Sequence, residues 1–302
     1  METRAKACAF GTALGVTAVL LAQLLVPRQI QSCQTCQPEA DGAPITRGTE
    51  ASKSLVSIPF LEVLLGASNI DSSSLIASLN KRYSSGSILV IGANVGDTWN
   101  DPLWAMIRTD RTFHKVFVEP IPVLFKQLEK NVAAANMTNA SLVNAAISDT
   151  TSERDMYCWK LTETGDALGG MPGWFSQLCS FHRERLTSNP YDTGRVKVPR
   201  ALRKSENIVK YIVPTLTVAA LLQKYNTKVR DIRYVQIDTE GFDFHVLEQL
   251  PFDDPLFRPA AIVYEDVLLS EPQKHFLREK FHQCGYILKR DKQNIVGCRV
   301  LD

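Results

Sequence analysis

An excess of charge of one sign is absent from this 302-residue sequence, which contains 34 lysines and arginines and 32 aspartates and glutamates. The formal net charge is therefore only +2. Because binding to nucleic acid depends largely on lysines and arginines that neutralise phosphates, the sequence argues against a nucleic-acid partner. With 45% hydrophobic and 22% charged residues, it has the composition of a globular protein, and we expect one large domain.

The glycine-containing turn at residues 92–96 lacks the features of a phosphate-binding loop. It follows a buried apolar strand, Ile88 to Ile91, and reads Gly-Ala-Asn-Val-Gly. The lysine of a phosphate loop and the three-glycine spacing of a dinucleotide site are both missing, and Asp97 would repel a pyrophosphate. The turn therefore predicts a site for a nucleoside without phosphates.

Charged residues are also absent from Ala7 to Val26, near the N-terminus. At ~1.5 Å per residue, a helix of this length spans about 30 Å, the thickness of the bilayer core. We predict an uncleaved single-pass anchor; a signal peptide or an organellar transit peptide is the alternative. Arg4 and Lys6 favour an N-terminus in the cytosol, which would place the globular part in the lumen of the ER or Golgi, with a secreted or organellar location as the alternative.

Residues 27–57 contain few large apolar side chains and many Pro, Gly, Ser, Thr and Gln residues, which predicts a flexible stem. The globular domain is predicted to span residues 58–302. It contains four cysteines that are either buried free thiols or, in a lumenal domain, disulfide partners: Cys158, Cys179, Cys284 and Cys298.

The globular part alternates short β-branched runs with segments whose apolar residues lie three and four apart, which is typical of an α/β sheet. Strands are predicted at 88–91, 115–120, 140–149, 232–238 and 260–266, and helices at 71–80, 102–107, 122–136, 215–225, 242–250 and 274–284. Residues 285–300 are predicted to form an antiparallel hairpin at the sheet edge. Sheets of this kind bind ligands at the carboxyl ends of their parallel strands.

Acidic residues follow three of these predicted strands. Glu119 closes the second strand, where its carboxylate can accept hydrogen bonds from both hydroxyls of a ribose. Asp238 and Glu240 follow the fourth strand, and Glu265 closes the fifth. A glycine turn with a ribose-binding acid suits S-adenosylmethionine, whereas the simpler alternative makes these acids caps and salt-bridge partners. The acids after the fourth and fifth strands could converge on one ligand or on a divalent cation, but acids alone do not define a metal site, so we assign none.

In this order, the blocks GANVGDT, VFVEP, LVNAAISD, VPTLTVAALL, IRYVQIDTEGFDFHVLEQL and AAIVYED resemble the FkbM-like methyltransferase family, over residues 86–268. The resemblance implies a Rossmann-like class I methyltransferase fold, S-adenosylmethionine as cofactor, and methyl transfer to an oxygen of a sugar or another hydroxylated small molecule. The sequence departs from the family at Val90, where an acid is usual, and at Gln236, where a lysine is usual.

The resemblance also implies roles for individual residues. Cofactor contacts are expected at the glycine turn, at the ribose-binding acid and at the end of the third strand: Gly92, Ala93, Asn94, Gly96, Asp97, Glu119, Asn144, Ala146 and Asp149. Residues 150–213 are predicted to form a loop or lid that binds the acceptor, with Trp174 and Phe175 exposed for stacking and Glu265 as a further contact.

Removal of the acceptor proton is assigned first to Asp238, then to Glu240 and then to His182, for which a surface or structural role is the alternative. Two other functions stay open. Val90 and Gln236 motivate a non-catalytic relative that keeps the fold and binds a partner. The anchor and stem motivate a lumenal glycosyltransferase, which would need a metal-binding Asp-x-Asp motif; residues 238–240 match it only approximately.

Overall fold

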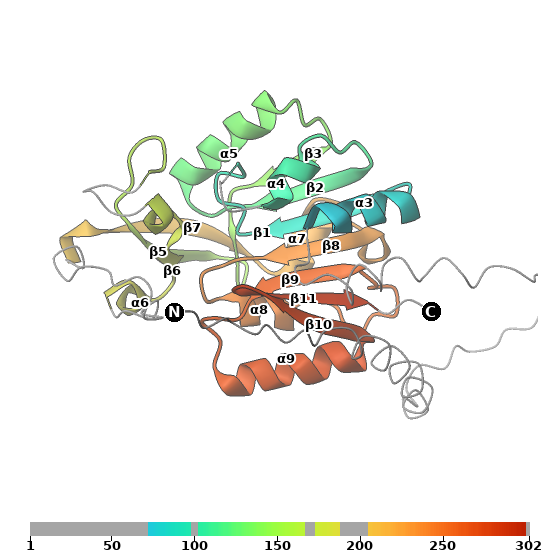
Figure 1. The fold of residues 1–302 in the computed structure, drawn as a ribbon. Helices are drawn as coiled ribbons and strands as arrows, with labels where there is room; N and C mark the ends of the chain where they lie inside the picture. Colours follow the sequence, from blue (N-terminus) through green and yellow to red (C-terminus); the bar gives the residue numbers. More distant parts are fainter. Residues whose placement is uncertain (1–71, 98–101, 167–172, 188–204, 300–302) are drawn as a thin grey trace, which may run out of the picture. The chain divides into compact units, whose positions relative to one another are not determined.

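The computed structural model of this protein describes residues 72–97, 102–166, 173–187 and 205–299 (Figure 1). The predicted anchor, Ala7 to Val26, and the predicted stem lie outside these residues and stay predictions. Within the described ranges, every helix is too short or too polar to cross a bilayer.

Seven strands form the main sheet in the order β10-β11-β9-β8-β1-β2-β3 (Figure 1). The parallel strands are β1 (Gly86–Ile91), β2 (Phe113–Val118), β3 (Ala140–Val143), β8 (Ile232–Ile237) and β9 (Ala261–Glu265). The hairpin consists of β10 (Tyr286–Asp291) and β11 (Asn294–Arg299), and β11 runs antiparallel between β9 and β10. The predicted mostly parallel sheet with a terminal antiparallel hairpin is confirmed.

Helices cover both faces of the main sheet. They are α3 (Ser72–Arg82), α4 (Pro102–Ile107), α5 (Pro122–Ala134), α7 (Val218–Lys224), α8 (Asp243–Glu248) and α9 (Glu271–Gln283). Because successive strand side chains point to opposite faces, β1 contributes to two separate apolar clusters. Ile88 and Val90 pack with residues of α3, α4 and α5, whereas Leu89 and Ile91 pack with residues of α7, α8 and α9.

A second sheet of four strands, in the order β4-β7-β5-β6, lies to one side of the main sheet (Figure 1). Its strands are β4 (Ala146–Ile147), β5 (Glu153–Trp159), β6 (Cys179–Ser180) and β7 (Ile208–Leu216). A short helix, α6 (Arg183–Thr187), and the 3-10 helix η3 (Gly173–Gln177) flank β6. The prediction of a loop over residues 150–213 is therefore wrong where the structure describes that segment.

The single third strand predicted at residues 140–149 is also wrong, because the chain changes sheets within it. The Asn144 Nδ2 group donates hydrogen bonds to the carbonyl oxygens of Glu119 and Pro120, at 2.9 and 3.1 Å. These bonds tie the chain to the end of β2 between β3 and β4. Beyond this point, Ala146 and Ile147 pair with β7 rather than with β2.

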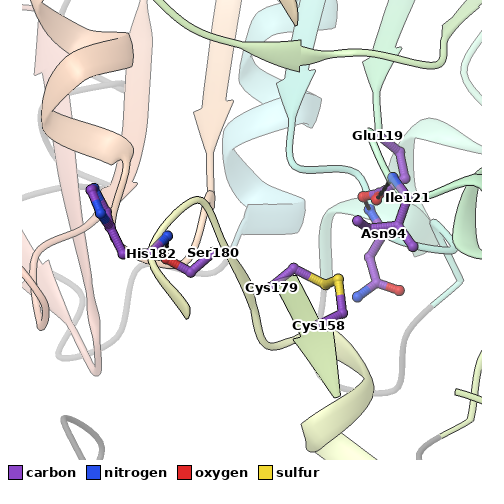
Figure 2. The surroundings of a disulfide bond; sticks show 7 residues. All are labelled: Asn94, Glu119, Ile121, Cys158, Cys179, Ser180 and His182. Carbon is purple, nitrogen blue, oxygen red and sulfur yellow. Dashed lines mark hydrogen bonds between the residues drawn. A yellow bond between two sulfur atoms is a disulfide. The ribbon is translucent and has the colours of Figure 1, made fainter. Parts of the chain in front are cut away.

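A disulfide joins Cys158 of β5 to Cys179 of β6 (Figure 2). Cys284 and Cys298 are free thiols. The second sheet therefore contains the disulfide, whereas the free thiols lie at the end of α9 and in β11. The bond closes a loop in the second sheet across 21 positions of the chain. It fixes a strand of only two residues, which by itself forms few hydrogen bonds.

Candidate functional site

The strand register brings predicted site residues together at the carboxyl edge of the main sheet. The last matched positions of β3, β2, β1, β8 and β9 lie at one level, as Val143, Val118, Ile91, Ile237 and Tyr264. The residues that follow them form one row along the edge, in the order Asn144, Glu119, Gly92, Asp238 and Glu265. Asn294 of β11 pairs with Glu265 and extends this edge row.

A cavity of about 460 Å³ lies along the edge row, a volume typical of small-molecule sites. Its lining includes many of the predicted site residues: Gly92, Ala93, Asn94, Glu119, Ala146, His182, Asp238, Glu240 and Glu265. The structure therefore gathers predicted cofactor, acceptor and catalytic residues around one space, although they come from six separate stretches of the chain.

Gly92 sits where the backbone of two strands meets. Its φ is +85°, and a Cβ atom there would lie 1.7 Å from the carbonyl oxygen of Asp238. The Gly92 and Ala93 N–H groups both donate to the Val118 carbonyl oxygen at 2.9 Å. Only glycine fits this position, because any side chain would collide with the backbone that carries Asp238.

Glu119 is held beside the glycine turn, as the chain spacing predicts. Its side chain is buried, and its two carboxylate oxygens accept hydrogen bonds from the N–H groups of Asn94 and Ile121, each at 2.8 Å. Burial, together with a smaller contribution from the charge of Asp238, raises the pKa of Glu119 to about 7, although the two N–H donors oppose the rise. Each oxygen keeps lone-pair capacity for a second donor, such as a ribose hydroxyl.

Asp243 organises the loop that carries Asp238 and Glu240. Its buried carboxylate accepts hydrogen bonds from the Thr239 hydroxyl at 2.9 Å and from the Gly241 N–H at 3.2 Å. Burial raises its pKa to about 6, against these hydrogen bonds. The sequence analysis gave no role to Asp243, because its central position in the loop depends on tertiary contacts.

The loop itself turns through two consecutive residues with positive φ, Glu240 at +54° and Gly241 at +97°. Positive φ is uncommon for a residue with a side chain, and such residues are enriched at functional sites. Here the turn places Asp238, Glu240 and Gly241 together on the cavity lining.

The segment that runs from the end of η3 through β6 into α6 also lines the cavity, and we call these residues the cavity wall: Gln177, Cys179, Ser180, Phe181, His182 and Arg185. Figure 2 shows part of this cavity wall beside the disulfide, together with Asn94, Glu119 and Ile121. Arg185 connects the wall to the main sheet, because its guanidinium donates to the Gly241 carbonyl oxygen at 3.0 Å. A Cβ atom on Gly241 would lie 2.1 Å from that guanidinium.

Several predicted site residues take other positions. Gly96, Asp97, Asn144 and Asp149 are not among the described residues that line the cavity. Gly96 is instead buried, and a Cβ atom there would lie 2.6 Å from the ring of Trp104.

The exposed position predicted for Phe175 is wrong. Its side chain is 1% exposed, and its ring packs against Trp159 with centroids 5.6 Å apart, in a small core of the second sheet. The side chain of Trp174, the other predicted stacking residue, lies outside the described residues.

Sequence reasoning missed two parts of the cavity lining. Arg185 lies in a segment interpreted as a loop, and no motif marks it. The hairpin turn contributes Lys292, Gln293 and Asn294, because β11 pairs with β9 and brings the turn to the edge row. In the described part of the chain, no group of His, Cys, Asp and Glu side chains has an arrangement that could hold a metal ion.

Comparison with known proteins places the chain in a family. The model described as "Methyltransferase FkbM domain" matches residues 91–288. A solved structure, precorrin-6y C5,15-methyltransferase from Geobacter metallireducens GS-15, aligns over 76% of this chain and 87% of that chain, with a TM-score of 0.35 and 7% identity. A comparison with curated proteins finds no match. Because the family model covers well over half of the chain, this protein belongs to the methyltransferase FkbM domain family.

Proposed function

We propose that this protein is an S-adenosylmethionine-dependent methyltransferase that methylates a hydroxyl oxygen of a glycan or another hydroxylated small molecule. The observation that carries the proposal is the position of Glu119: a buried carboxylate, one strand away from Gly92, on the lining of the cavity. This arrangement suits a ribose, and the neighbouring turn lacks the lysine of a phosphate-binding loop.

The edge row suggests how the cofactor lies. With its ribose hydroxyls on Glu119, the adenine would lie against the apolar residues Ile121, Ala146 and Ile147, which line the same end of the cavity. The methionine part would then pass over Gly92, where no side chain blocks it, toward Asp238. When bound, S-adenosylmethionine supplies an electrophilic methyl group on a positively charged sulfur.

The protein's own tasks are alignment of the acceptor and removal of its proton. The acceptor would lie between the cavity wall and the loop after β8, where Phe181, His182, Glu240 and Phe242 line the cavity. Asp238, Glu240 and His182 are the proton acceptors that we propose. A carboxylate in a poorly hydrated cavity has a raised pKa, which makes it a better base near neutral pH.

The two departures from the family lie side by side, since Val90 and Gln236 are paired positions on β1 and β8. Where the family usually has an acid and a lysine, this chain has lost both charges together. Neither of these two positions therefore carries a charge without its partner, which is compatible with an intact site. This observation favours the enzyme over the non-catalytic relative.

The location of the domain is also part of the proposal. The Cys158–Cys179 disulfide supports a compartment in which disulfides persist, such as the lumen of the secretory pathway. The proposed anchor at Ala7 to Val26 would hold the domain at the membrane.

Calorimetric titration of S-adenosylmethionine into the full-length chain tests the cofactor, and transfer of a labelled methyl group to hydroxylated acceptors tests the reaction. We expect micromolar binding that Glu119→Ala lowers at least tenfold, because the ribose loses its acceptor. An exposed control, Glu129→Ala on α5, should bind as the wild type does. Absence of binding by folded wild-type protein would refute the proposal.

A further inference from the structure

The segment between α5 and β3 contains two consecutive tripeptides of the form Asn-x-Ser/Thr. They read Asn-Met-Thr at residues 136–138 and Asn-Ala-Ser at residues 139–141, and the sequence contains no others. In the secretory pathway this pattern is the acceptor for an N-linked oligosaccharide. The proposed methyl transfer makes no use of either tripeptide, so each can be judged by its own structure.

Helix α5 ends in a Schellman motif that fixes the backbone of the first tripeptide. Asn136 has a φ of +49°, a conformation in which Asn and Gly are enriched. The Asn136 N–H donates to the Ala133 carbonyl oxygen at 2.9 Å, and the Met137 N–H donates to the Val132 carbonyl oxygen at 3.1 Å. Both hydrogen bonds join backbone groups, so the motif does not use the side-chain amide of Asn136.

The two side chains that define the first tripeptide are both exposed. Met137, which lies between them, is 6% exposed and belongs to the apolar cluster that includes Val132 and Leu128. Asn136 and Thr138, on either side of it, are exposed, and within the described residues neither side chain forms a hydrogen bond. An oligosaccharide on the Asn136 amide would therefore displace no contact of the described fold.

The second tripeptide differs because it runs into the main sheet. Ser141 pairs with Val116 of β2, and the Ser141 hydroxyl forms a hydrogen bond with the ring of His114 at 2.9 Å. Asn139 is half-buried, and its carbonyl oxygen accepts from the Lys115 N–H at 3.0 Å. Folding therefore engages the second tripeptide in the sheet and leaves the first one exposed.

Asn136 also lies far from the proposed cofactor site. Helix α5 begins at Pro122, directly after the cavity-lining residue Ile121, and its 13 residues span roughly 20 Å at ~1.5 Å per residue. Asn136 follows the other end of this helix, and residues 135–139 are not part of the cavity lining. A glycan at this position would leave the cavity open.

Resting on the lumenal location within the proposed function, we propose that Asn136 carries an N-linked oligosaccharide and that Asn139 does not. The donor is a lipid-linked oligosaccharide diphosphate. The side-chain nitrogen of Asn136 forms a bond to the anomeric carbon, the bond from that carbon to the diphosphate oxygen breaks, and one amide proton passes to solvent. The Cys158–Cys179 disulfide supports an oxidising compartment of the kind in which this transfer occurs.

The test is expression of the full-length chain in cultured animal cells, followed by digestion with a peptide N-glycosidase and gel electrophoresis. Digestion in water labelled with heavy oxygen converts a glycosylated asparagine into a labelled aspartate, which mass spectrometry of peptides locates. Thr138→Ala removes the first acceptor pattern and keeps Asn136 in the Schellman motif, whereas Thr138→Ser keeps the pattern. Asn139→Gln removes the second pattern alone.

We expect a single glycan on wild-type protein, with the label at Asn136, and the same glycan on Asn139→Gln. Thr138→Ala should lose the glycan completely, and Thr138→Ser should keep it. Enzymatic removal of the glycan should change the affinity for S-adenosylmethionine by less than about twofold, because Asn136 lies away from the cavity.

The outcomes separate this inference from the proposed reaction. A wild-type chain without a glycan overturns the inference and the lumenal location, and if that chain binds S-adenosylmethionine the proposed reaction stands. A label at Asn139, or a glycan that persists in Thr138→Ala, also overturns the inference. A chain that is glycosylated at Asn136 but binds no S-adenosylmethionine supports the glycan and refutes the proposed methyltransferase.

Discussion

The main sheet and the second sheet border the same cavity, but they hold their side chains in different ways. At the edge row, ladder pairing across five strands sets the positions of Glu119, Asp238 and Glu265. In the cavity wall, a two-residue strand is held by a disulfide, by the small core around Phe175 and by Arg185. Under the proposed function, the edge row would bind the cofactor, whereas the cavity wall would bind the acceptor.

The largest expected effect comes from Gly92→Ala, which disrupts the edge row at its centre. The added Cβ atom would lie 1.7 Å from the Asp238 carbonyl oxygen, so β1 and β8 must separate. We expect a loss of cofactor affinity of at least about a hundredfold, measured by calorimetry, and a lower melting temperature. Gly285→Ala is the matched control: φ there is +76°, but no atom lies within 4 Å, so it should cost about 1 kcal/mol and leave binding unchanged.

Removal of the disulfide should loosen the cavity wall and leave the edge row unchanged. Replacement of Cys158 and Cys179 by serine should lower the free energy of unfolding by about 3 kcal/mol, because the loop closed by the bond regains its freedom in the unfolded chain. Since the edge row is held independently, the affinity for S-adenosylmethionine should fall less than about tenfold. Denaturant unfolding and calorimetry check the two parts. A complete loss of cofactor binding by folded double variant would show that the two regions are not separable.

The pH dependence of stability tests the edge row through Glu265. The pKa of Glu265 is raised to about 8 in the folded protein, so ionisation of this side chain opposes folding. Its contribution to the free energy of unfolding is fully present below about pH 4.5 and is lost as the pH rises through 8. Glu265→Gln should therefore stabilise the protein by as much as about 4 kcal/mol at pH 9 and have little effect at pH 4.5. Melting temperatures of wild type and variant at both pH values test this. An equal effect at both would contradict the assigned ionisation.

The smallest expected effect concerns the link between the two regions. Arg185→Ala removes the hydrogen bond to the Gly241 carbonyl oxygen and should cost about 1 kcal/mol. Amide hydrogen exchange should become faster in residues 239–242, while residues 86–91 of β1 keep their protection. Arg185→Lys keeps a donor and should fall between the variant and the wild type. Unchanged exchange in the loop would mean that Asp243 alone fixes it.

The same contrast explains which features could be predicted from the sequence. Glu119, Gly92 and Asp238 follow apolar runs that alternate with amphipathic helices, and parallel strands bring their carboxyl ends to one edge. The second sheet was missed because β5 pairs with β7, whose partner residues lie 49 to 61 positions further along the chain, and both strands include charged residues. The Asp155–Lys210 pair, at 3.1 Å, lies on their exposed sides and interrupts the apolar pattern.

Phe175 and Asp243 show why individual roles need the tertiary structure. An aromatic residue near glycines is typical of an exposed binding loop, yet Phe175 is buried because η3 folds back onto Trp159 of β5. The carboxylate of Asp243 is close in the chain to Thr239 and Gly241, but its contact with the N–H of Glu265 depends on the pairing of β8 with β9. Short-range sequence patterns do not show which distant strands and side chains come into contact.

The most direct test of the central claim is a crystal structure of the full-length chain with S-adenosylhomocysteine bound. The account predicts that both ribose hydroxyls lie within hydrogen-bonding distance of the Glu119 carboxylate, that the ligand crosses Gly92, and that its ammonium group lies beside Asp238. A ligand bound outside the edge row, or one whose ribose contacts neither oxygen of Glu119, would contradict it.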